Sequence, residues 1–169
     1  MVAFPFFFMM FAIIEIGIIF VTDSILENAV VESGRLVRTG RAATSKLTAE
    51  QFKTELCGRM NVFASQCVAR ATLDVREIPQ FRNQTPPDPL VSGTGFDDSK
   101  LTYQTGQPGS LMLVRVWYRQ PLFTPFLSQA LSRPGDGAAI MTATTTFRNE
   151  PYQQCGDPTP ALPSPNKAF

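Results

Sequence analysis

The chain has 169 residues, 44% of them hydrophobic and 17% charged, which is enough for one compact domain together with a membrane segment. Fifteen basic and fourteen acidic side chains leave a net charge of +1. This balance argues against a dedicated nucleic-acid-binding protein, which needs a basic field or stripe. The sequence has no histidine, so Ser-His-Asp triads, Cys-His pairs and His-ligated metal sites are excluded.

Residues 1–21 are predicted to form a transmembrane anchor. Eighteen of these twenty-one residues are Ala, Val, Ile, Met or Phe, and the exceptions are Pro5, Glu15 and Gly17. About twenty apolar residues at roughly 1.5 Å each match the hydrocarbon core of a bilayer, about 30 Å thick. No Lys or Arg precedes the run and no small-residue cleavage site follows it, which favours a retained anchor over a cleaved signal peptide. Basic flanks normally set orientation, so their lack leaves two interpretations: the true N-terminus lies upstream of Met1, or the chain is not processed in the usual way.

Glu15 is the one ionisable residue in this anchor. A carboxylate at mid-membrane depth is unfavourable by about 3 kcal/mol, so it must be neutralised, paired or turned toward protein. One interpretation is a protonated or snorkelling Glu near an interface. The other is a contact with a neighbouring helix, where Gly17 would let another backbone approach closely. On the second interpretation, Glu15 and Gly17 are candidate residues for helix–helix assembly.

Residues 22–46 are predicted to continue the same helix as an amphipathic segment, with the helix itself ending near Thr44. No Pro occurs between residues 22 and 41, and apolar or small residues recur at roughly helical spacing. Arg35, Arg38 and Arg41 lie mostly elsewhere on the circumference. We interpret these arginines as a solvated face; the alternative is that they pair with acidic groups on a neighbouring subunit.

Residues 47–150 are predicted to form an α+β domain that packs on this amphipathic half. Thr48 and Gln51 have the spacing of a capping box at a helix start. The apolar face of that helix would consist of Phe52, Leu56 and Met60. Three strands are predicted from alternation and β-branched content, at residues 68–76, 111–119 and 139–148. In the last strand, one face would carry Met141, Ala143, Thr145 and Phe147.

Three segments lie outside these elements. Residues 79–109 contain five Pro and four Gly, and a loop of this length usually forms a functional or mobile surface. Residues 120–127 are apolar but contain two Pro, so they cannot form a central strand. We expect Phe123 and Phe126 to be buried under the sheet, the alternative being an exposed apolar corner. Residues 151–169, with five Pro, are predicted to be a disordered tail.

Cys57 and Cys67 are predicted to form a disulfide, because they flank a turn between a helix end and a strand start. In an oxidising compartment, this bond would stabilise the fold by about 2–3 kcal/mol. Free thiols in the core are the alternative. A metal site would need more ligands of suitable spacing, and no phosphate-binding or catalytic constellation is present. We therefore expect a protein that is not an enzyme and binds no cofactor or metal.

Several stretches, taken in order, resemble the TadE-like pseudopilins. They are I-I-E-I-G at residues 13–17, L-E-N-A at 26–29 and R-L-V-R-T-G-R at 35–41, then L-V-R-V-W-Y at 113–118, P-L-F-T-P-F at 121–126 and F-R-N-E-P at 147–151. The resemblance covers roughly residues 1–152. It implies an α+β, type IV pilin-like fold, in which a long N-terminal helix, its first half transmembrane, packs on a small antiparallel sheet of three or four strands.

The resemblance also implies a function. The protein would be a structural or assembly pseudopilin of a Tad-type (Flp) pilus, contributing to pilus biogenesis, surface adherence and biofilm formation. Its partners would be other pilins and pseudopilins, the Tad inner-membrane assembly platform and membrane lipid, with no nucleic acid. It would cross the inner membrane once, place its C-terminal domain in the periplasm and enter a surface pilus.

In one respect the sequence departs from this family. Family precursors carry a basic leader and a Glu shortly after the processing site, whereas Glu15 matches a later Glu and the earlier one is absent. A prepilin peptidase would be a partner where a leader exists upstream. The competing interpretation is a membrane-tethered periplasmic binding or adhesin domain with no filament role, and a ligand pocket lined by residues 79–109 would favour it.

Overall fold

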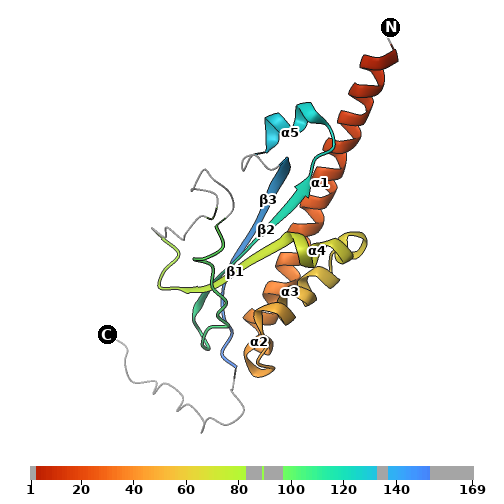
Figure 1. The fold of residues 1–169 in the computed structure, drawn as a ribbon. Helices are drawn as coiled ribbons and strands as arrows, with labels where there is room; N and C mark the ends of the chain where they lie inside the picture. The colour runs from red at the N-terminus through yellow and green to blue at the C-terminus, as the bar shows by residue number, and fades with distance from the viewer. Residues whose placement is uncertain (1–2, 83–88, 90–96, 133–136, 153–169) are drawn as a thin grey trace, which may run out of the picture.

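The computed structural model describes residues 3–82, 89, 97–132 and 137–152. A long helix, α1, packs along one face of a three-stranded antiparallel sheet with the order β1-β2-β3, and short helices lie beside it (Figure 1). This confirms the predicted α+β layout. The elements are α1 Ala3–Arg38, α2 Arg41–Thr44, α3 Ala49–Gly58, the 3-10 helix η1 Asn61–Phe63, α4 Ala64–Arg70, β1 Ala71–Ile78, β2 Leu111–Pro121, α5 Pro125–Leu131 and β3 Ala138–Arg148.

The two halves of α1 have different surroundings. Most of its apolar side chains before Thr22 are exposed, whereas the buried residues follow a helical spacing along the rest of its length. Where α1 crosses β3, Gly34 allows the closest approach, since an added Cβ would lie 3.1 Å from side-chain atoms of Thr145 and Phe147. The buried residues of α1 are Glu15, Thr22, Leu26, Ala29, Val30, Ser33, Gly34 and Val37.

The long helix ends earlier than predicted. We expected it to reach about Thr44, but α1 stops at Arg38 and Gly40 adopts φ 73° before the separate turn of α2. The left-handed glycine is a common end of an α-helix, and the chain that follows β3 packs against this point. The backbone N–H of Glu150 donates to the carbonyl of Arg38 over 2.8 Å, and the ring of Tyr152 occupies the space that a Cβ on Gly40 would need.

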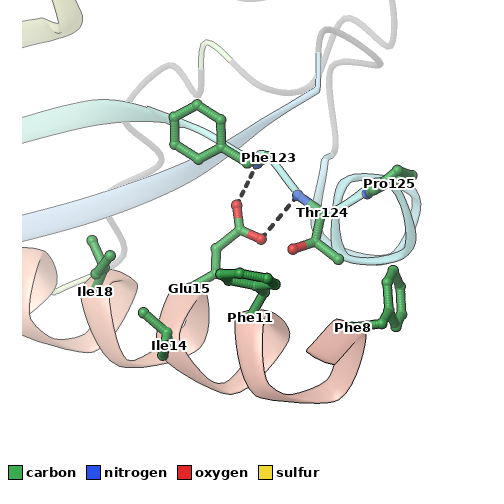
Figure 2. Close-up of a pocket in the computed structure, with 8 residues that line it drawn as sticks. All are labelled: Phe8, Phe11, Ile14, Glu15, Ile18, Phe123, Thr124 and Pro125. Carbon is green, nitrogen blue, oxygen red and sulfur yellow. Dashed lines mark hydrogen bonds between the residues drawn. The ribbon is translucent and has the colours of Figure 1, made fainter. Parts of the chain in front are cut away.

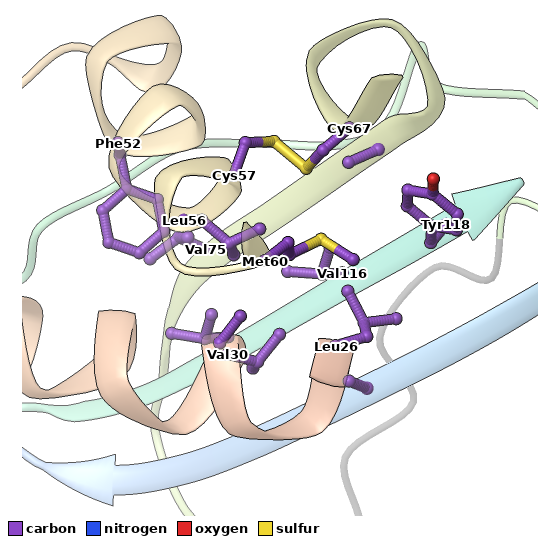
Figure 3. Packing of buried hydrophobic residues seen from close by; sticks show 14 of the residues in the cluster. Leu26, Val30, Phe52, Leu56, Cys57, Met60, Cys67, Val75, Val116 and Tyr118 are labelled. Atoms are coloured by element: carbon purple, nitrogen blue, oxygen red, sulfur yellow. A yellow bond between two sulfur atoms is a disulfide. The ribbon is translucent and has the colours of Figure 1, made fainter. Parts of the chain in front are cut away.

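The capping box that begins α3 is confirmed. The N–H of Gln51 donates to Thr48 Oγ1 over 3.3 Å, and the N–H of Thr48 donates to Gln51 Oε1 over 3.0 Å. Phe52, Leu56 and Met60 are fully buried, as the spacing predicted. They pack with Leu26, Val30, Val75, Val116 and Tyr118 between α1, α3 and the sheet (Figure 3).

The first strand begins later than predicted, while the other two agree closely. Residues 68–70, assigned to a strand because apolar and polar residues alternate there, are the last turn of α4. This short helix is held by the disulfide between Cys57 and Cys67, whose Cα atoms are 5.4 Å apart (Figure 3). The predicted disulfide is therefore present. In β3, Met141 and Ala143 are buried and their neighbours in sequence are more exposed, as expected.

Part of the 79–109 segment is ordered against the sheet. The N–H of Val75 donates to the carbonyl of Thr102, and the N–H of Gln104 donates to the carbonyl of Val75, both over 2.8 Å. Tyr103 thereby forms a parallel bridge to Val75 on the outer side of β1. These residues cover the sheet edge that β1 would otherwise leave unpaired. Most of the predicted disordered tail, from residue 153 onward, lies outside the described residues.

Candidate functional site

Glu15 binds the backbone of its own domain. Its side chain is only 8% exposed and points from α1 toward the turn between β2 and α5 (Figure 2). The carboxylate accepts hydrogen bonds from the N–H of Phe123 and from the N–H of Thr124, the latter over 3.0 Å. The partner that the sequence analysis sought on a neighbouring helix is therefore found within the chain. Backbone donors leave no signal in the sequence, so pattern reasoning missed this contact.

An apolar cleft of about 430 Å³ surrounds this contact. Apart from Glu15 and Thr124, it is lined by apolar side chains of α1 and of the turn before α5 (Figure 2). Phe123 is 85% exposed, so the expectation that it would be buried under the sheet is wrong. It lies at the end of β2, where the chain turns its N–H toward Glu15. The side chain of Phe126 lies outside the described residues. The apolar lining residues are Phe8, Phe11, Ile14, Ile18, Phe123 and Pro125.

Gly17, the second candidate assembly residue, faces away from the domain. Two residues correspond to about 200° around an α-helix, so Glu15 and Gly17 lie on nearly opposite sides of α1. A Cβ added to Gly17 would meet no atom within 4 Å. The structure thus separates the two residues, with Glu15 engaged by its own domain and Gly17 on an open face of the helix.

Two of the three candidate inter-subunit arginines have partners within the chain. Arg35 Nη1 lies 3.4 Å from Glu32 Oε1, and Arg38 Nε lies 3.2 Å from Glu150 Oε1. Both pairs are largely exposed, so each contributes at most about 1 kcal/mol. Arg41 is exposed on α2, with no ion pair to the described part of the chain.

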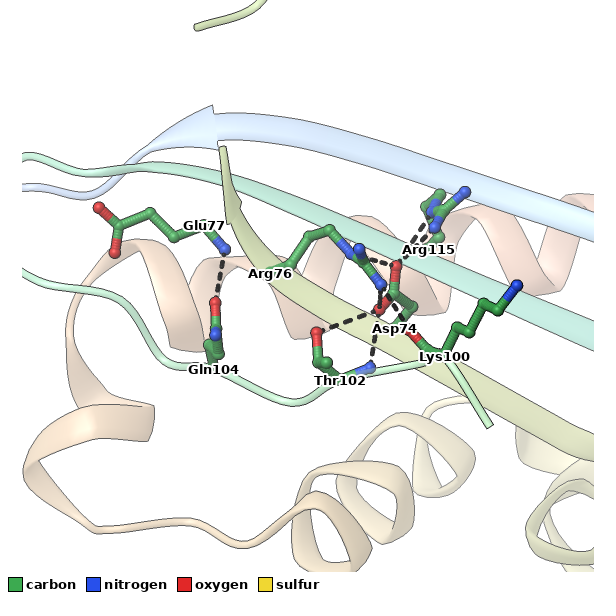
Figure 4. A network of polar contacts seen from close by, with 7 residues as sticks. All are labelled: Asp74, Arg76, Glu77, Lys100, Thr102, Gln104 and Arg115. Carbon is green, nitrogen blue, oxygen red and sulfur yellow. Dashed lines mark hydrogen bonds and ion pairs between the residues drawn. The ribbon is translucent and has the colours of Figure 1, made fainter. Parts of the chain in front are cut away.

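A buried ion cluster between β1 and β2 was not predicted (Figure 4). Asp74 on β1 is fully buried and opposite Arg115 on β2. Its carboxylate lies 2.6 Å from Nη2 of Arg76 and 2.6 Å from Nη2 of Arg115, and it accepts the N–H of Thr102 over 3.0 Å. The isolated Arg115 within the apolar strand at residues 111–118 was the sequence signal for such a partner.

The cluster holds Asp74 in its charged form. Burial raises the pKa of Asp74, but the hydrogen bonds from Arg76, Arg115 and the Thr102 N–H together outweigh burial and bring the pKa below its usual value. The guanidinium of Arg115 also stacks over the ring of Trp117, 4.8 Å from its centroid. Asp74 therefore joins β1, β2 and the 97–104 segment, which is a structural role.

A second groove, of about 320 Å³, lies between α3 and the segment that pairs with β1. Lys53 and Tyr103 are among the residues that line it, together with Asp98 and Thr102. Burial lowers the pKa of Lys53, against the raising effect of the nearby Glu50, and burial raises the pKa of Tyr103. Among the described residues, no group of three or more Cys, Asp or Glu side chains could hold a metal ion.

Within the described part of the chain, α1 alone is long and apolar enough to cross a membrane, judged by length and composition. Residues 1–35, which include most of α1, match the family model of TadE-like proteins. The match supports the resemblance drawn from residues 13–17 and 26–29, whereas the stretches at 113–126 and 147–151 lie beyond it. No curated protein and no solved structure matches the chain.

Proposed function

We propose that this protein is a pseudopilin, a structural component of a Tad-type (Flp) pilus system that supports pilus biogenesis, surface adherence and biofilm formation. The observation that carries the proposal is the coincidence of the TadE-like match with α1, whose first half exposes an apolar surface. A helix of this kind needs lipid or other helices around it. The protein is not an enzyme on this proposal, and it needs no cofactor or metal.

Assembly would use the open side of α1. Glu15 is engaged by the corner before α5, so the face that remains for other helices is the one with Gly17. A glycine there lets a second backbone approach closely, and dispersion contacts then hold the helices together. The partners would be other pilins and pseudopilins, the inner-membrane assembly platform of the Tad system and, where a leader exists upstream, a prepilin peptidase.

The disulfide supports a proposed orientation of the protein in the membrane. Bonded cysteines persist in the periplasm and are rare in the cytoplasm. The domain that holds Cys57 and Cys67 would therefore face the periplasm, and the N-terminal end of α1 would face the cytoplasm. The protein would cross the inner membrane once.

Complementation of a deletion strain tests the proposal. Loss of the gene should abolish or strongly reduce surface pili and adherence, and the wild-type chain should restore both. Gly17→Leu should restore membrane-bound protein but not pili, because the added side chain keeps the neighbouring helix away. Ile16→Leu, which adds no bulk on the adjacent position, should restore pili fully. Normal piliation of the deletion strain would contradict the proposal.

A second candidate function is supported by the groove beside Lys53, which the 98–103 segment helps to line. On this alternative, the protein is a membrane-tethered periplasmic binding or adhesin domain without a filament role. Lys53→Ala should then reduce adherence while pilus number stays normal. Lys100→Ala removes an exposed lysine nearby and is the matched control. Equal adherence of the two variants would argue against this alternative.

A further inference from the structure

We propose that the corner formed by residues 122–131, which comprises the turn after β2 and helix α5, is embedded among the acyl chains of the bilayer beside α1. The protein would then enter the membrane with two elements rather than one. The proposal depends on the insertion of α1 and is independent of any role in a pilus.

The position of Glu15 within the apolar part of α1 is the first observation that supports the proposal. A hydrocarbon core of about 30 Å needs about 20 helical residues, and the run up to Thr22 supplies that length with Glu15 as its only charged residue. The next charged residue after Glu15 is Asp23, which agrees with that boundary. Eight residues separate Glu15 from Asp23, so Glu15 lies about 12 Å inside the apolar layer.

The corner lies at the same depth as Glu15. The N–H of Thr124 is 3.0 Å from the Glu15 carboxylate, and the N–H of Phe123 donates to the same group. Figure 1 shows α5 beside the N-terminal half of α1, beyond the end of the sheet. If α1 spans the bilayer, these contacts leave no place for the corner outside the apolar layer.

The composition of the corner suits hydrocarbon. No charged residue occurs in the thirteen positions from Gln120 to Ser132, between Arg119 and Arg133. Phe123 and Leu131 are exposed on its surface, and Phe123 also lines the apolar cleft against Phe8 and Phe11. Exposed apolar side chains that are continuous with a membrane-spanning surface are expected to contact lipid. The occupant of the cleft is therefore an acyl chain.

The backbone N–H groups of residues 122–124 are hydrogen-bonded within the protein, as an apolar medium requires. Irregular backbone is tolerated at membrane depth only where its polar groups are satisfied by protein, since each unpaired group costs several kcal/mol. The N–H of Leu122 donates to the carbonyl of Gly137 over 3.0 Å, and those of Phe123 and Thr124 donate to Glu15. Pro125 has no N–H. Glu15 thereby accepts the hydrogen bonds that water would accept from an exposed turn.

Spin-label accessibility on the full chain in phospholipid vesicles tests the proposal. In a Cys155→Ser background that keeps the Cys57–Cys67 bond, a nitroxide is attached at Phe123→Cys. Oxygen partitions into the bilayer, whereas a nickel chelate stays in water, so the ratio of the two accessibilities reports depth. Ile13→Cys, 63% exposed and two residues from Glu15, is the membrane reference. Val31→Cys, 55% exposed and sixteen residues after Glu15 on α1, is the water reference.

The proposal requires that the label at position 123 gives an oxygen-to-nickel ratio close to that at position 13 and several-fold above that at position 31. A ratio equal to that at position 31 would place the corner in water and overturn the proposal. Protection from both reagents would also overturn it, because it would show that protein rather than lipid covers the corner. Neither result would affect the complementation test of pilus function.

Discussion

The hydrogen-bonding partner of Glu15 is the main point on which the structure departs from the sequence-based expectation. The place of Glu15 in the apolar run indicated that its carboxylate needs a hydrogen-bonding partner, and the structure provides one. The identity of the partner could not be predicted, because two backbone N–H groups more than a hundred residues away supply it. The carboxylate therefore fixes the corner before α5 to α1 through hydrogen bonds within the chain.

We predict that Glu15→Ala keeps the protein in the membrane but lowers its free energy of unfolding by about 2 kcal/mol or more, because two backbone donors lose their acceptor. Glu15→Gln, which keeps one acceptor oxygen, should lose less. Thermal unfolding in detergent micelles, followed by circular dichroism, measures both. Glu27→Ala, at an exposed position of the same helix, is the control. A loss equal to that of the control would mean that the contact does not stabilise the fold.

Asp74 gives a pH-dependent prediction. Its pKa in the folded protein lies below the usual value, so it stabilises the fold above about pH 4, and this stabilisation is lost as pH falls through the folded-state pKa. Asp74→Asn leaves two guanidinium groups without their carboxylate and should lower the unfolding free energy at pH 7 by about 3 kcal/mol. Its stability should also change less between pH 5 and pH 3 than that of the wild type.

Urea denaturation in detergent at the two pH values measures this effect. Asp98→Asn, at an exposed position, should behave like the wild type. A variant Asp74→Asn with the wild-type dependence on pH would show that other carboxyl groups dominate acid unfolding.

Among the elements, those with local causes were predictable. The capping box of α3 needs only Thr48 and Gln51, three residues apart, and the burial pattern of β3 follows from alternation within the strand. The errors arose where contacts with residues far away in the sequence determine the local structure. Tyr152 packs against Gly40 at the end of the helix. The disulfide bond to Cys57 holds the helix that includes residues 68–70. The 101–104 segment pairs with the edge of β1. The alternation of apolar and polar residues carries no information about these distant contacts.

The break after α1 leads to a third prediction. Gly40→Ala should destabilise the fold by more than about 1 kcal/mol, because an L-residue is strained at φ 73° and its Cβ would displace the Tyr152 ring. Gly58→Ala is the matched control, since its Cβ would meet nothing within 4 Å and alanine favours the helix by up to about 1 kcal/mol. Opposite shifts of the two melting temperatures are expected; a stabilised Gly40→Ala variant would contradict this account of the break.

At the scale of the whole molecule, α1 is shared between two environments. Its second half completes the core of the domain, and its first half presents apolar side chains outward. Because one continuous helix does both, the domain cannot rotate freely relative to the first half of α1. The contact between Glu15 and the corner adds a second point of attachment.

The orientation is tested by a reporter fused after Phe169. We expect a periplasm-dependent reporter such as alkaline phosphatase to be active there, because the disulfide indicates an oxidising compartment for the domain that follows α1. Fusion of a reporter that works only in the cytoplasm is the control and should be inactive. Activity confined to the cytoplasmic reporter would reverse the proposed orientation.

The docking of Tyr152 beside Gly40 also decides where the remainder of the chain starts. Sixteen residues of helix rise separate Thr22 from Arg38, the last residue of α1, so the docking point next to it lies roughly 24 Å along the helix from Thr22, the proposed membrane boundary, and away from the first half of α1. The last seventeen residues, with Cys155 among them, follow Tyr152 in the sequence. An epitope or affinity tag placed directly after Tyr152 would therefore be attached far from the proposed membrane segment, where antibodies and resins can reach it without contacting the first half of α1.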